Sequence, residues 1–214
     1  EGFKTTNYVL IENKSDIYSN ENLLPGFLKT CTLGYDGKGQ YVINNKDEVE
    51  LLNIDFKKKY ILEKKINLKK EISVIITRFL NNDYLIYEPI ENIHVNQILN
   101  KSVIPAVIDK NIFTQAQHQA KLLAEKLGYI GTMCIEYFID DKNNLLVNEI
   151  APRVHNSGHL TINAYNISQF ENHVRAVCNL EKIELNKNYN AEMINIIGEE
   201  IKIYRAKNYS KNEF

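Results

Sequence analysis

The chain has 214 residues, of which 44% are hydrophobic and 25% are charged, and its formal net charge at pH 7 is −1. This is the composition of a soluble globular protein with enough apolar residues for a substantial core. The near-neutral balance does not favour nucleic-acid binding, which usually requires a basic excess, and no apolar run approaches the roughly 20 residues that a membrane-spanning helix needs.

The first half of the chain contains short β-branched and aromatic runs bounded by turn residues. Such runs are typical of strands, and several in succession indicate an antiparallel sheet. The expected strands are GFLKTC (26–31), YVI (41–43), YILEKKI (60–66), EISVIITRF (71–79) and DYLIYEPI (83–90). The glycine-rich stretch TLGYDGKGQ (32–40) lies between the first two and is expected to form a turn.

Two helices are expected in the second half. Residues 111–127 repeat apolar side chains at helical spacing, and Gly128 marks the end. Residues 168–180 begin with Ser168 and carry Glu171 three positions later, which is the pattern of a capping box. The apolar face of this helix is expected to contain Phe170, Val174, Val177 and Cys178. Because strands and helices are mixed without βαβ alternation, the sequence predicts an α+β fold rather than a doubly wound sheet.

Three cysteines, Cys31, Cys134 and Cys178, are widely separated in the sequence. Their odd number and the lack of a CxxC spacing argue against a disulfide framework and against a zinc site, and they favour a reducing, cytoplasmic compartment. The N-terminus EGFKTTNYVL has no signal-peptide pattern and no initiating methionine, which is consistent with a piece of a longer protein.

Two further strands, GTMCIEYFID (131–140) and LLVNEI (145–150), are expected to pair as a hairpin. A four-residue connection, 141–144, pairs Asp140 with Leu145. A five-residue connection shifts the register by one residue, which moves side chains to the other face of the sheet. The length of the turn therefore decides which side chains face each other.

With the four-residue connection, Glu136 lies directly opposite Glu149, at a Cβ separation of roughly 5 Å. Facing carboxylates repel each other unless a cation or a proton lies between them. Magnesium prefers hard oxygen ligands and commonly uses one or two carboxylates together with substrate phosphates. The pair therefore indicates a magnesium site, whereas in the shifted register one of the two carboxylates faces solvent.

The glycine-rich stretch has glycines at positions 34, 37 and 39. Glycines allow backbone amides to approach phosphate oxygens without obstruction by side chains. Lys29, on the preceding strand, is a cation within reach of the same phosphates. No GK[ST] follows, so the stretch is not a Walker loop, and by itself it is also consistent with a plain hairpin turn.

Together, the glycine-rich stretch, the lysine and the carboxylate pair resemble the ATP-grasp superfamily. The polar run NEIAPRVHNSGHLT (148–161), followed by ISQFENHVRAV (167–177), is similar to the 5-(carboxyamino)imidazole ribonucleotide synthase family. LGYDGKGQ (33–40) and LGYIGTMCIEYF (127–138) are similar to that family's phosphate loop and metal strand. The resemblance covers nearly the whole chain, and it implies an ATP-dependent ligase that carboxylates aminoimidazole ribonucleotide with bicarbonate, through carboxyphosphate, in purine biosynthesis.

The resemblance also implies an ATP-grasp fold, in which two α+β subdomains clasp the nucleotide. Residues 1–62 would form the small subdomain with the phosphate loop, residues 63–185 the large subdomain with the hinge, metal and bicarbonate sites, and residues 186–214 the start of a C-terminal region. Family members have a preceding N-terminal domain and a basic motif near the C-terminus, and neither is recognised in this sequence. A homodimer is implied as well.

The nucleotide contacts are carried over position by position. The ATP phosphates would be held by Lys29 and by Gly34, Tyr35, Asp36, Gly37, Lys38, Gly39 and Gln40. The hinge whose backbone pairs with adenine would consist of Glu63, Lys64, Lys65 and Ile66. Glu71 would bind the ribose hydroxyls, and His94 would contact the nucleotide.

The remaining roles fall on the metal strand, the polar run and the loop. Glu136 and Glu149, with Asn148 beside them, would hold magnesium. The bicarbonate and carboxyphosphate pocket would be lined by Arg153, His155 and Asn156. The imidazole ribonucleotide would face Tyr35, Asp36, Lys38 and Arg153.

Bicarbonate and carboxyphosphate are small anions without apolar surface. A pocket that binds them needs many hydrogen-bond donors, which the polar run 148–161 contains. Arg153 offers a planar fork suited to an oxyanion. His155 is expected to share or transfer a proton near neutral pH.

Other interpretations remain open for the histidines and for the function. His94 is also consistent with a surface or capped strand histidine, His118 and His173 with structural or solvated positions, and His159 with a hydrogen bond inside its loop. The chain is also consistent with another ATP-grasp carboxylate–amine ligase, such as a formate-dependent transformylase, although the PRVHNSGH run argues against it. A third hypothesis is a truncated nucleotide-binding module without full turnover.

Overall fold

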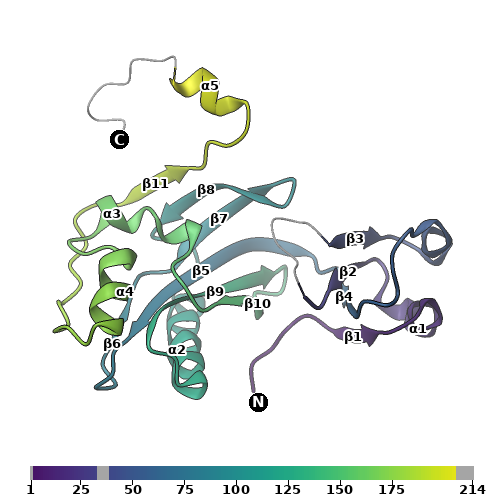
Figure 1. Cartoon of the computed structure of the whole chain (residues 1–214), viewed down its shortest axis with the longest axis horizontal. Helices are drawn as coiled ribbons and strands as arrows, with labels where there is room; N and C mark the ends of the chain where they lie inside the picture. Colours follow the sequence, from purple (N-terminus) through teal and green to yellow (C-terminus); the bar gives the residue numbers. More distant parts are fainter. Residues whose placement is uncertain (1, 33–38, 206–214) are drawn as a thin grey trace.

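The computed structural model describes residues 2–32 and 39–205. Two β-sheets dominate this part of the chain and lie side by side, the smaller one formed by the N-terminal segment (Figure 1). Neighbouring strands in both sheets run antiparallel. Because helices accompany the strands without βαβ crossovers, the predicted α+β fold is confirmed.

The small sheet has the strand order β1-β4-β2-β3. Its strands are β1 (Tyr8–Ile11), β2 (Gly26–Thr30), β3 (Gln40–Ile43) and β4 (Tyr60–Lys64). It is accompanied by the helix α1 (Lys14–Ser19) and the 3-10 helices η1 (Glu21–Leu23) and η2 (Lys46–Leu51). Ile17 and Val49 from these helices share a fully buried core with Leu28 and Leu62 of the strands.

The large sheet has the strand order β10-β9-β5-β7-β8-β11, with β6 paired to β5. Its strands are β5 (Leu68–Arg78), β6 (Tyr84–Ile86), β7 (Ile90–Val95), β8 (Ile98–Ile104), β9 (Gly131–Asp140), β10 (Leu145–Ala151) and β11 (Ala191–Ile194). Its helices are α2 (Lys110–Leu127), η3 (Asn156–Gly158), α3 (Thr161–Ala164) and α4 (Gln169–Val177), and α5 (Glu200–Arg205) follows β11. The proposed subdomain boundaries at 62/63 and 185/186 stay a prediction.

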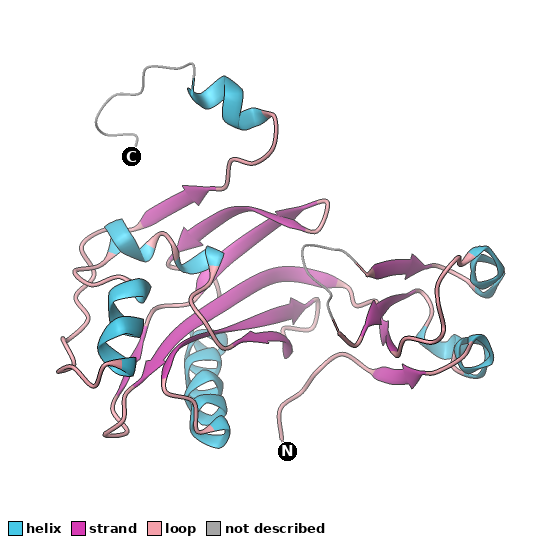
Figure 2. Cartoon of the chain, in the orientation of Figure 1, coloured by secondary structure: helices cyan, strands magenta, loops and turns pink. Residues whose placement is uncertain are grey.

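The central strand β5 is covered on both faces. Val74 and Ile76 pack with Ala120 of α2 on one face, whereas Ile75 packs with Leu160 in a separate cluster on the other. Helices consequently flank the strands of the large sheet in Figure 2. Residues 72–76 are all fully buried, without the alternation of a half-exposed strand, because neither face meets water. The buried stretch of β5 thus lies at the centre of the large sheet, and its half-exposed end carries Glu71.

Most of the predicted strands are present. The runs 26–31, 41–43, 60–66, 71–79, 131–140 and 145–150 each correspond to a strand. The run 83–90 is divided between β6 and β7, and Pro89, which has no backbone N–H for a sheet ladder, lies at the break. The strands β1, β8 and β11 were not predicted.

The helix expected at 111–127 is confirmed as α2. The Asp109 side chain caps it by accepting a hydrogen bond from Asn111 N, and Gly128 ends it in the left-handed conformation, with φ of 61°. In the part of the chain that the structure describes, neither α2 nor any other helix is long and apolar enough to cross a membrane.

The expected apolar face of α4 is wrong. Ser168 does cap the helix, accepting from Glu171 N, while the Glu171 carboxylate pairs with Arg175. The side chains that α4 buries are Gln169, Asn172 and Ala176. Those that it exposes include Phe170, Val174, Val177 and Cys178. Hydropathy misleads here because the two buried amides have hydrogen-bond partners inside the fold.

Gly26→Ala should destabilise the small sheet. A Cβ at this position would lie 2.8 Å from the carbonyl oxygens of Glu63 and Leu23, which are backbone atoms held in place by neighbouring elements. Overpacking of this kind costs about 1–3 kcal/mol. We expect a loss of about 2 kcal/mol in the free energy of unfolding, measured by denaturant titration. Val42→Ala, at an exposed position of β3, is the control and should change it by less than about 0.5 kcal/mol; equal losses in the two variants would contradict the close contact.

Candidate active site

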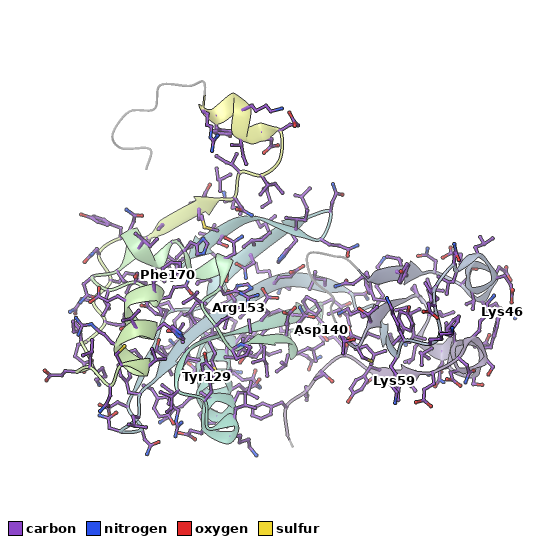
Figure 3. The ribbon with its side chains drawn as sticks, in the orientation of Figure 1. Lys46, Lys59, Tyr129, Asp140, Arg153 and Phe170 are labelled. Carbon is purple, nitrogen blue, oxygen red and sulfur yellow. The ribbon has the colours of Figure 1, made fainter. Side chains whose placement is uncertain are left out.

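A cavity of about 820 Å³ lies between the two sheets. Every predicted site residue that the structure describes lines it, apart from Gly39. These lining residues are Lys29, Gln40, Glu63, Lys64, Lys65, Ile66, Glu71, His94, Glu136, Asn148, Glu149, Arg153, His155 and Asn156. In Figure 3, Arg153 lies over the large sheet, and Asp140 marks the end of β9 that is nearest the small sheet.

Sequence reasoning missed a second set of lining residues. They are Thr6, Phe27, Leu68, Gln97, Ile98, Leu99, Phe138, Asn195 and Ile197. Most are apolar or amide side chains. Nothing in the sequence distinguishes the strands that carry them from other strands of the core or the surface. Only the folded sheet brings them to one cavity, and they give it apolar walls beside its charged groups.

The glycine-rich stretch connects two neighbouring antiparallel strands. Lys29 of β2 pairs with Gln40 of β3, and Thr30 N donates to Gly39 O at 3.0 Å. Gly39 has a φ of 76°, which favours glycine. The predicted phosphate contacts at 34–38 lie outside the described residues.

The small sheet contributes an ion pair to the cavity. Lys29 Nζ lies 2.5 Å from Glu63 Oε2, and both side chains are largely buried. The ammonium group is therefore held at the cavity wall by a carboxylate from the adjacent strand β4. A polyanion entering the cavity would find a preorganised cation, with its position already fixed.

The large sheet contributes a second charged pair. His94 Nδ1 lies 2.7 Å from Glu71 Oε2, although the ring N–H is not aligned with that oxygen as a linear hydrogen bond requires. Burial by itself lowers the pKa of His94, but the contact with Glu71 and the charge of Glu136 outweigh it and raise the pKa above its ordinary value. His94 thus lines the cavity beside carboxylates that favour protonation of its ring, and it is not a surface histidine.

The hairpin of β9 and β10 differs from the expected register. The predicted pairing of Asp140 with Leu145 is wrong, because Leu145 pairs with Ile139. Asp140 N donates to Asn144 O at 3.2 Å, so the turn contains three residues instead of four. The Asp140 carboxylate accepts from Asn144 N at 2.7 Å, and Asn143 closes the turn with a φ of 60°, a left-handed conformation that asparagine tolerates.

A β-bulge restores the predicted carboxylate pair. The register shifts between Val147 and Glu149, so that Asn148 is the extra residue and Glu149 lies opposite Glu136. In a ladder without the bulge, the three-residue turn would place Asn148 opposite Glu136. The prediction of facing carboxylates is therefore confirmed, but the turn length from which it was inferred is not.

The electrostatics of Glu136 reflect this arrangement. Burial and the facing charge of Glu149 raise the pKa of Glu136 to about 7, and Glu71 adds to the effect. The positive charges of His94 and Arg153 act in the opposite direction. The site therefore contains a carboxylate whose negative charge is incompletely compensated by the protein.

The donor set fits magnesium with a nucleotide better than a metal ion held by protein alone. Within residues 2–32 and 39–205, no group of three or more His, Cys, Asp or Glu side chains is arranged to hold a metal ion. Two hard carboxylates are nevertheless the set that magnesium uses when substrate phosphates complete its coordination. Glu136 and Glu149 meet that requirement.

The loop after β10 brings Arg153 and His155 to the same cavity. Arg153 Nη1 donates to Val154 O at 3.0 Å, and His155 Nε2 lies 3.6 Å from Glu136 Oε1. Burial and the charge of Arg153 lower the pKa of His155 to about 4. This lowered pKa favours the neutral ring, and the environment therefore does not support the expected proton sharing near neutral pH.

A buried glutamine fixes the backbone of His155. Gln169 Oε1 accepts from His155 N at 3.0 Å, and Gln169 Nε2 donates to His155 O at 2.6 Å. The Gln169 amide thus binds both backbone groups of His155, as a neighbouring strand would. Sequence reasoning missed Gln169 because a polar residue next to a helix cap usually faces solvent.

The other histidines lie outside the cavity. His173 Nδ1 accepts a hydrogen bond from Thr132 N at 3.0 Å, His159 packs against the Phe170 ring, and His118 is exposed. None of the three lines the space described above.

Comparisons with known proteins agree with this geometry. Residues 1–170 match the ATP-grasp domain family. The chain is 38% identical to the N5-carboxyaminoimidazole ribonucleotide synthase of Bacillus subtilis (strain 168) and 42% identical to that of Staphylococcus aureus (strain MRSA252), over 94% of this chain and 54% of each relative. It therefore spans about half the length of the curated relatives it matches. The crystal structure of N5-carboxyaminoimidazole synthetase from Staphylococcus aureus complexed with ADP has a TM-score of 0.87 and 37% identity, covering 95% of this chain and 55% of that one.

Gly158→Ala should disturb the two hydrogen bonds by which Gln169 holds the His155 backbone, referred to below as the Gln169 clamp. A Cβ at Gly158 would lie 2.5 Å from Gln169 Oε1, and that amide is buried and doubly hydrogen-bonded. We expect a loss of about 2–3 kcal/mol in the free energy of unfolding, measured by denaturant titration.

A double-mutant cycle tests the cause of this loss. The double variant Gly158→Ala/Gln169→Ala no longer contains the clashing amide. Its loss in the free energy of unfolding should therefore be smaller than the sum of the two single-variant losses, by about 1 kcal/mol or more. Strictly additive losses would show that Gly158 does not act through Gln169.

Proposed function

The chain belongs to the ATP-grasp family, and from this premise we propose that it is the nucleotide-binding and catalytic region of a 5-(carboxyamino)imidazole ribonucleotide synthase. The proposed reaction carboxylates 5-aminoimidazole ribonucleotide with bicarbonate and ATP, giving 5-(carboxyamino)imidazole ribonucleotide, ADP and phosphate in purine biosynthesis. The observation that carries the proposal is the convergence of the carboxylate pair, the Lys29 ion pair and the Arg153–Asn156 segment on one cavity. A cytoplasmic homodimer is part of the proposal.

ATP is proposed to bind with its adenine at residues 63–66 and its phosphates toward Lys29 and the loop 34–40. The backbone N–H groups of Lys64 and Lys65 already donate to Asn7 O and Pro25 O, at 2.8 and 2.9 Å. We therefore assign adenine to the carbonyl oxygens of this stretch and to Ile66 N. Glu71 and His94 would contact the sugar side of the nucleotide.

Glu136 and Glu149 would hold magnesium, with Asn148 beside them. When bound, magnesium offsets the negative charge of the phosphoryl oxygens during transfer. The incompletely compensated charge on Glu136 supports this role, because a cation relieves the repulsion between the two carboxylates.

Arg153, His155 and Asn156 are proposed to bind bicarbonate and then carboxyphosphate. A bicarbonate oxygen attacks the γ-phosphoryl group of ATP, and ADP leaves. The amine of the ribonucleotide then attacks the carboxyl carbon of carboxyphosphate, and phosphate leaves. Arg153 stabilises the developing charge with a planar fork of donors, and the enclosed site limits hydrolysis of the reactive intermediate.

Tyr35, Asp36 and Lys38, together with Arg153, are proposed to face the ribonucleotide. The alternatives, another carboxylate–amine ligase or a nucleotide-binding module without turnover, are separated by one assay. Phosphate release from ATP is measured with and without bicarbonate and with and without aminoimidazole ribonucleotide, in the native full-length protein. Release that requires bicarbonate and increases with the ribonucleotide supports the proposal, and release that is indifferent to bicarbonate contradicts it.

Glu149→Gln should remove most ATP turnover and leave the fold intact. The substitution keeps the shape of an exposed side chain but removes one of the two proposed magnesium ligands. Turnover is followed by phosphate release and folding by thermal unfolding. Glu192→Gln, which breaks the ion pair of β11 with Lys101 away from the cavity, is the control and should retain turnover. A parental rate in Glu149→Gln would contradict the metal assignment, and loss of folding would indicate a structural role.

Arg153→Ala should separate ATP binding from bicarbonate chemistry. Arg153 follows β10 of the large sheet, whereas the proposed adenine contacts at 63–66 begin in β4 of the small sheet, so ATP affinity measured by calorimetry should change little. Loss of a charge-assisted contact that strengthens in the transition state should cost about 3 kcal/mol, or about a hundredfold in bicarbonate-dependent turnover. Arg153→Lys should recover only part of the rate, because lysine keeps the charge but not the two-pronged geometry.

Arg175→Ala is the matched control for Arg153→Ala. Arg175 pairs with Glu171 on α4, outside the cavity, and its loss should leave both measurements near parental values. The anion-pocket assignment is wrong if Arg153→Ala weakens ATP binding while turnover at saturating ATP is unchanged.

A further inference from the structure

A row of buried polar side chains crosses the large sheet and ends at the candidate active site. Ser102 of β8, Asn92 of β7, Ser73 of β5 and Ser157 of η3 follow one another, and Ser157 contacts His155. The serines are fully buried and Asn92 is 5% exposed. We refer to Ser102, Asn92, Ser73 and Ser157 as the polar row.

The hydrogen bonds of the polar row run in one direction. Ser102 Oγ donates to Asn92 Oδ1 at 2.9 Å, and Asn92 Nδ2 donates to Ser73 Oγ at 3.0 Å. Because Ser73 Oγ accepts from the amide, its single hydrogen is available for Ser157 Oγ, 2.8 Å away. Ser157 Oγ in turn lies 2.9 Å from His155 Nδ1, and the direction of this last bond is set at the ring.

The backbone supports the same direction at the histidine. Ser157 N also donates toward His155 Nδ1, at 3.4 Å. A nitrogen that accepts from a hydroxyl and an amide carries no hydrogen of its own, so the hydrogen of the neutral ring lies on Nε2. Nε2 is the ring nitrogen on the side of Glu136 and the cavity.

We propose that the polar row is a positioning device, which holds His155 in the Nε2–H tautomer and aims that N–H into the cavity as a neutral hydrogen-bond donor to an anionic substrate. The tautomer is inferred from the backbone N–H of Ser157, which donates to Nδ1, together with the row that leads to the Ser157 hydroxyl. Its use toward bicarbonate or carboxyphosphate rests on the proposed function.

The chemistry of the row fits positioning better than stabilisation. Buried hydroxyl and amide groups cost free energy unless they are paired, and apolar side chains of the same shape would fill this space without that requirement. The Cys134 thiol contacts the hydroxyls of Ser73 and Ser157 but brings no charge to the row, because burial raises its pKa well above the ordinary value. Paired polar groups, unlike apolar groups, can determine that Nδ1 of His155 accepts a hydrogen bond and that the ring hydrogen lies on Nε2.

The ring and the backbone of His155 are held by different groups. Gln169 binds the backbone N–H and C=O, whereas Ser157 binds the ring. A substitution in the polar row therefore changes the ring hydrogen bond while the backbone clamp remains. This separation allows the tautomer to be tested without displacing the loop.

The experiment is ¹⁵N NMR of the protein labelled in its histidines, without nucleotide, at neutral pH. The His155 signals are identified by their loss in His155→Gln. The parent should show an unprotonated Nδ1 and a protonated Nε2. A protonated Nδ1, or two nitrogens with averaged shifts, would overturn the proposal, and this measurement requires no variant of the row to fold.

Ser157→Ala removes the hydroxyl donor to Nδ1 and should lower the ratio of the Nε2–H to the Nδ1–H tautomer about fivefold, the effect of one ordinary hydrogen bond. The control is Thr77→Val, which removes another fully buried hydroxyl of β5 that bonds to Thr132 instead of the row. Thr77→Val should leave the His155 shifts unchanged. An equal shift in both variants, or none in Ser157→Ala, would overturn the proposal.

Kinetics of the native full-length protein give the functional part of the test. Ser157→Ala should lower kcat of bicarbonate-dependent phosphate release about tenfold, with KM for ATP unchanged, because the ring donor is assigned to the anion and not to the nucleotide. A changed KM for ATP with unchanged kcat would contradict the assignment to the anion. If the parent shows the Nε2–H tautomer but no bicarbonate-dependent release, the proposed function fails and the positioning role of the row stands.

Discussion

Glu136 and Glu149 occupy opposite positions on β9 and β10, and the sheet encloses most of the Glu136 side chain. Two negative charges at one cross-strand position repel each other, and this repulsion adds to burial in raising the pKa of Glu136 to about 7. The charge of Arg153 and that of His94 in its protonated form oppose this rise only in part. A bound cation would offset the remaining negative charge of the pair. The proposed nucleotide and anion contacts lie around these two carboxylates.

The position of the pair is set by the strands that carry it and by their pairing with β5. Residues 72–76 of β5 are fully buried, and β5 pairs along its length with β9, so hydrogen bonds hold the strand that carries Glu136 between β5 and β10. The bulge at Asn148 then sets the position of Glu149. The small sheet adds a cation, Lys29, held by Glu63. The cavity thus combines charges fixed by two separate sheets.

The buried polar side chains of the large sheet and of α4 are buried for the same reason, which is hydrogen bonding. Gln169 and Asn172 are buried, whereas apolar residues of the same helix, such as Val174, are exposed. Gln169 is buried because it binds the backbone of His155, and Asn172 because it donates to the Tyr87 hydroxyl. A pattern of hydrophobicity predicts burial only where apolar contact is the reason for burial, and in these places the reason is a hydrogen bond.

The sequence by itself determined the class of fold, most of the strands, the extent of α2 and the charged residues that line the cavity. These depend on local periodicity, on turn and cap residues, and on the motif that ends at Thr161, all of which lie within short stretches of chain. It did not determine the turn between β9 and β10, the bulge at Asn148, the buried face of α4, the Gln169 clamp or the row from Ser102 to Ser157. Each of these depends on a partner distant in the chain or on a register offset of one residue, and a polar side chain carries the same letter whether it is solvated or paired. Only the tertiary structure decides between these states, because only it places the partner within hydrogen-bond distance.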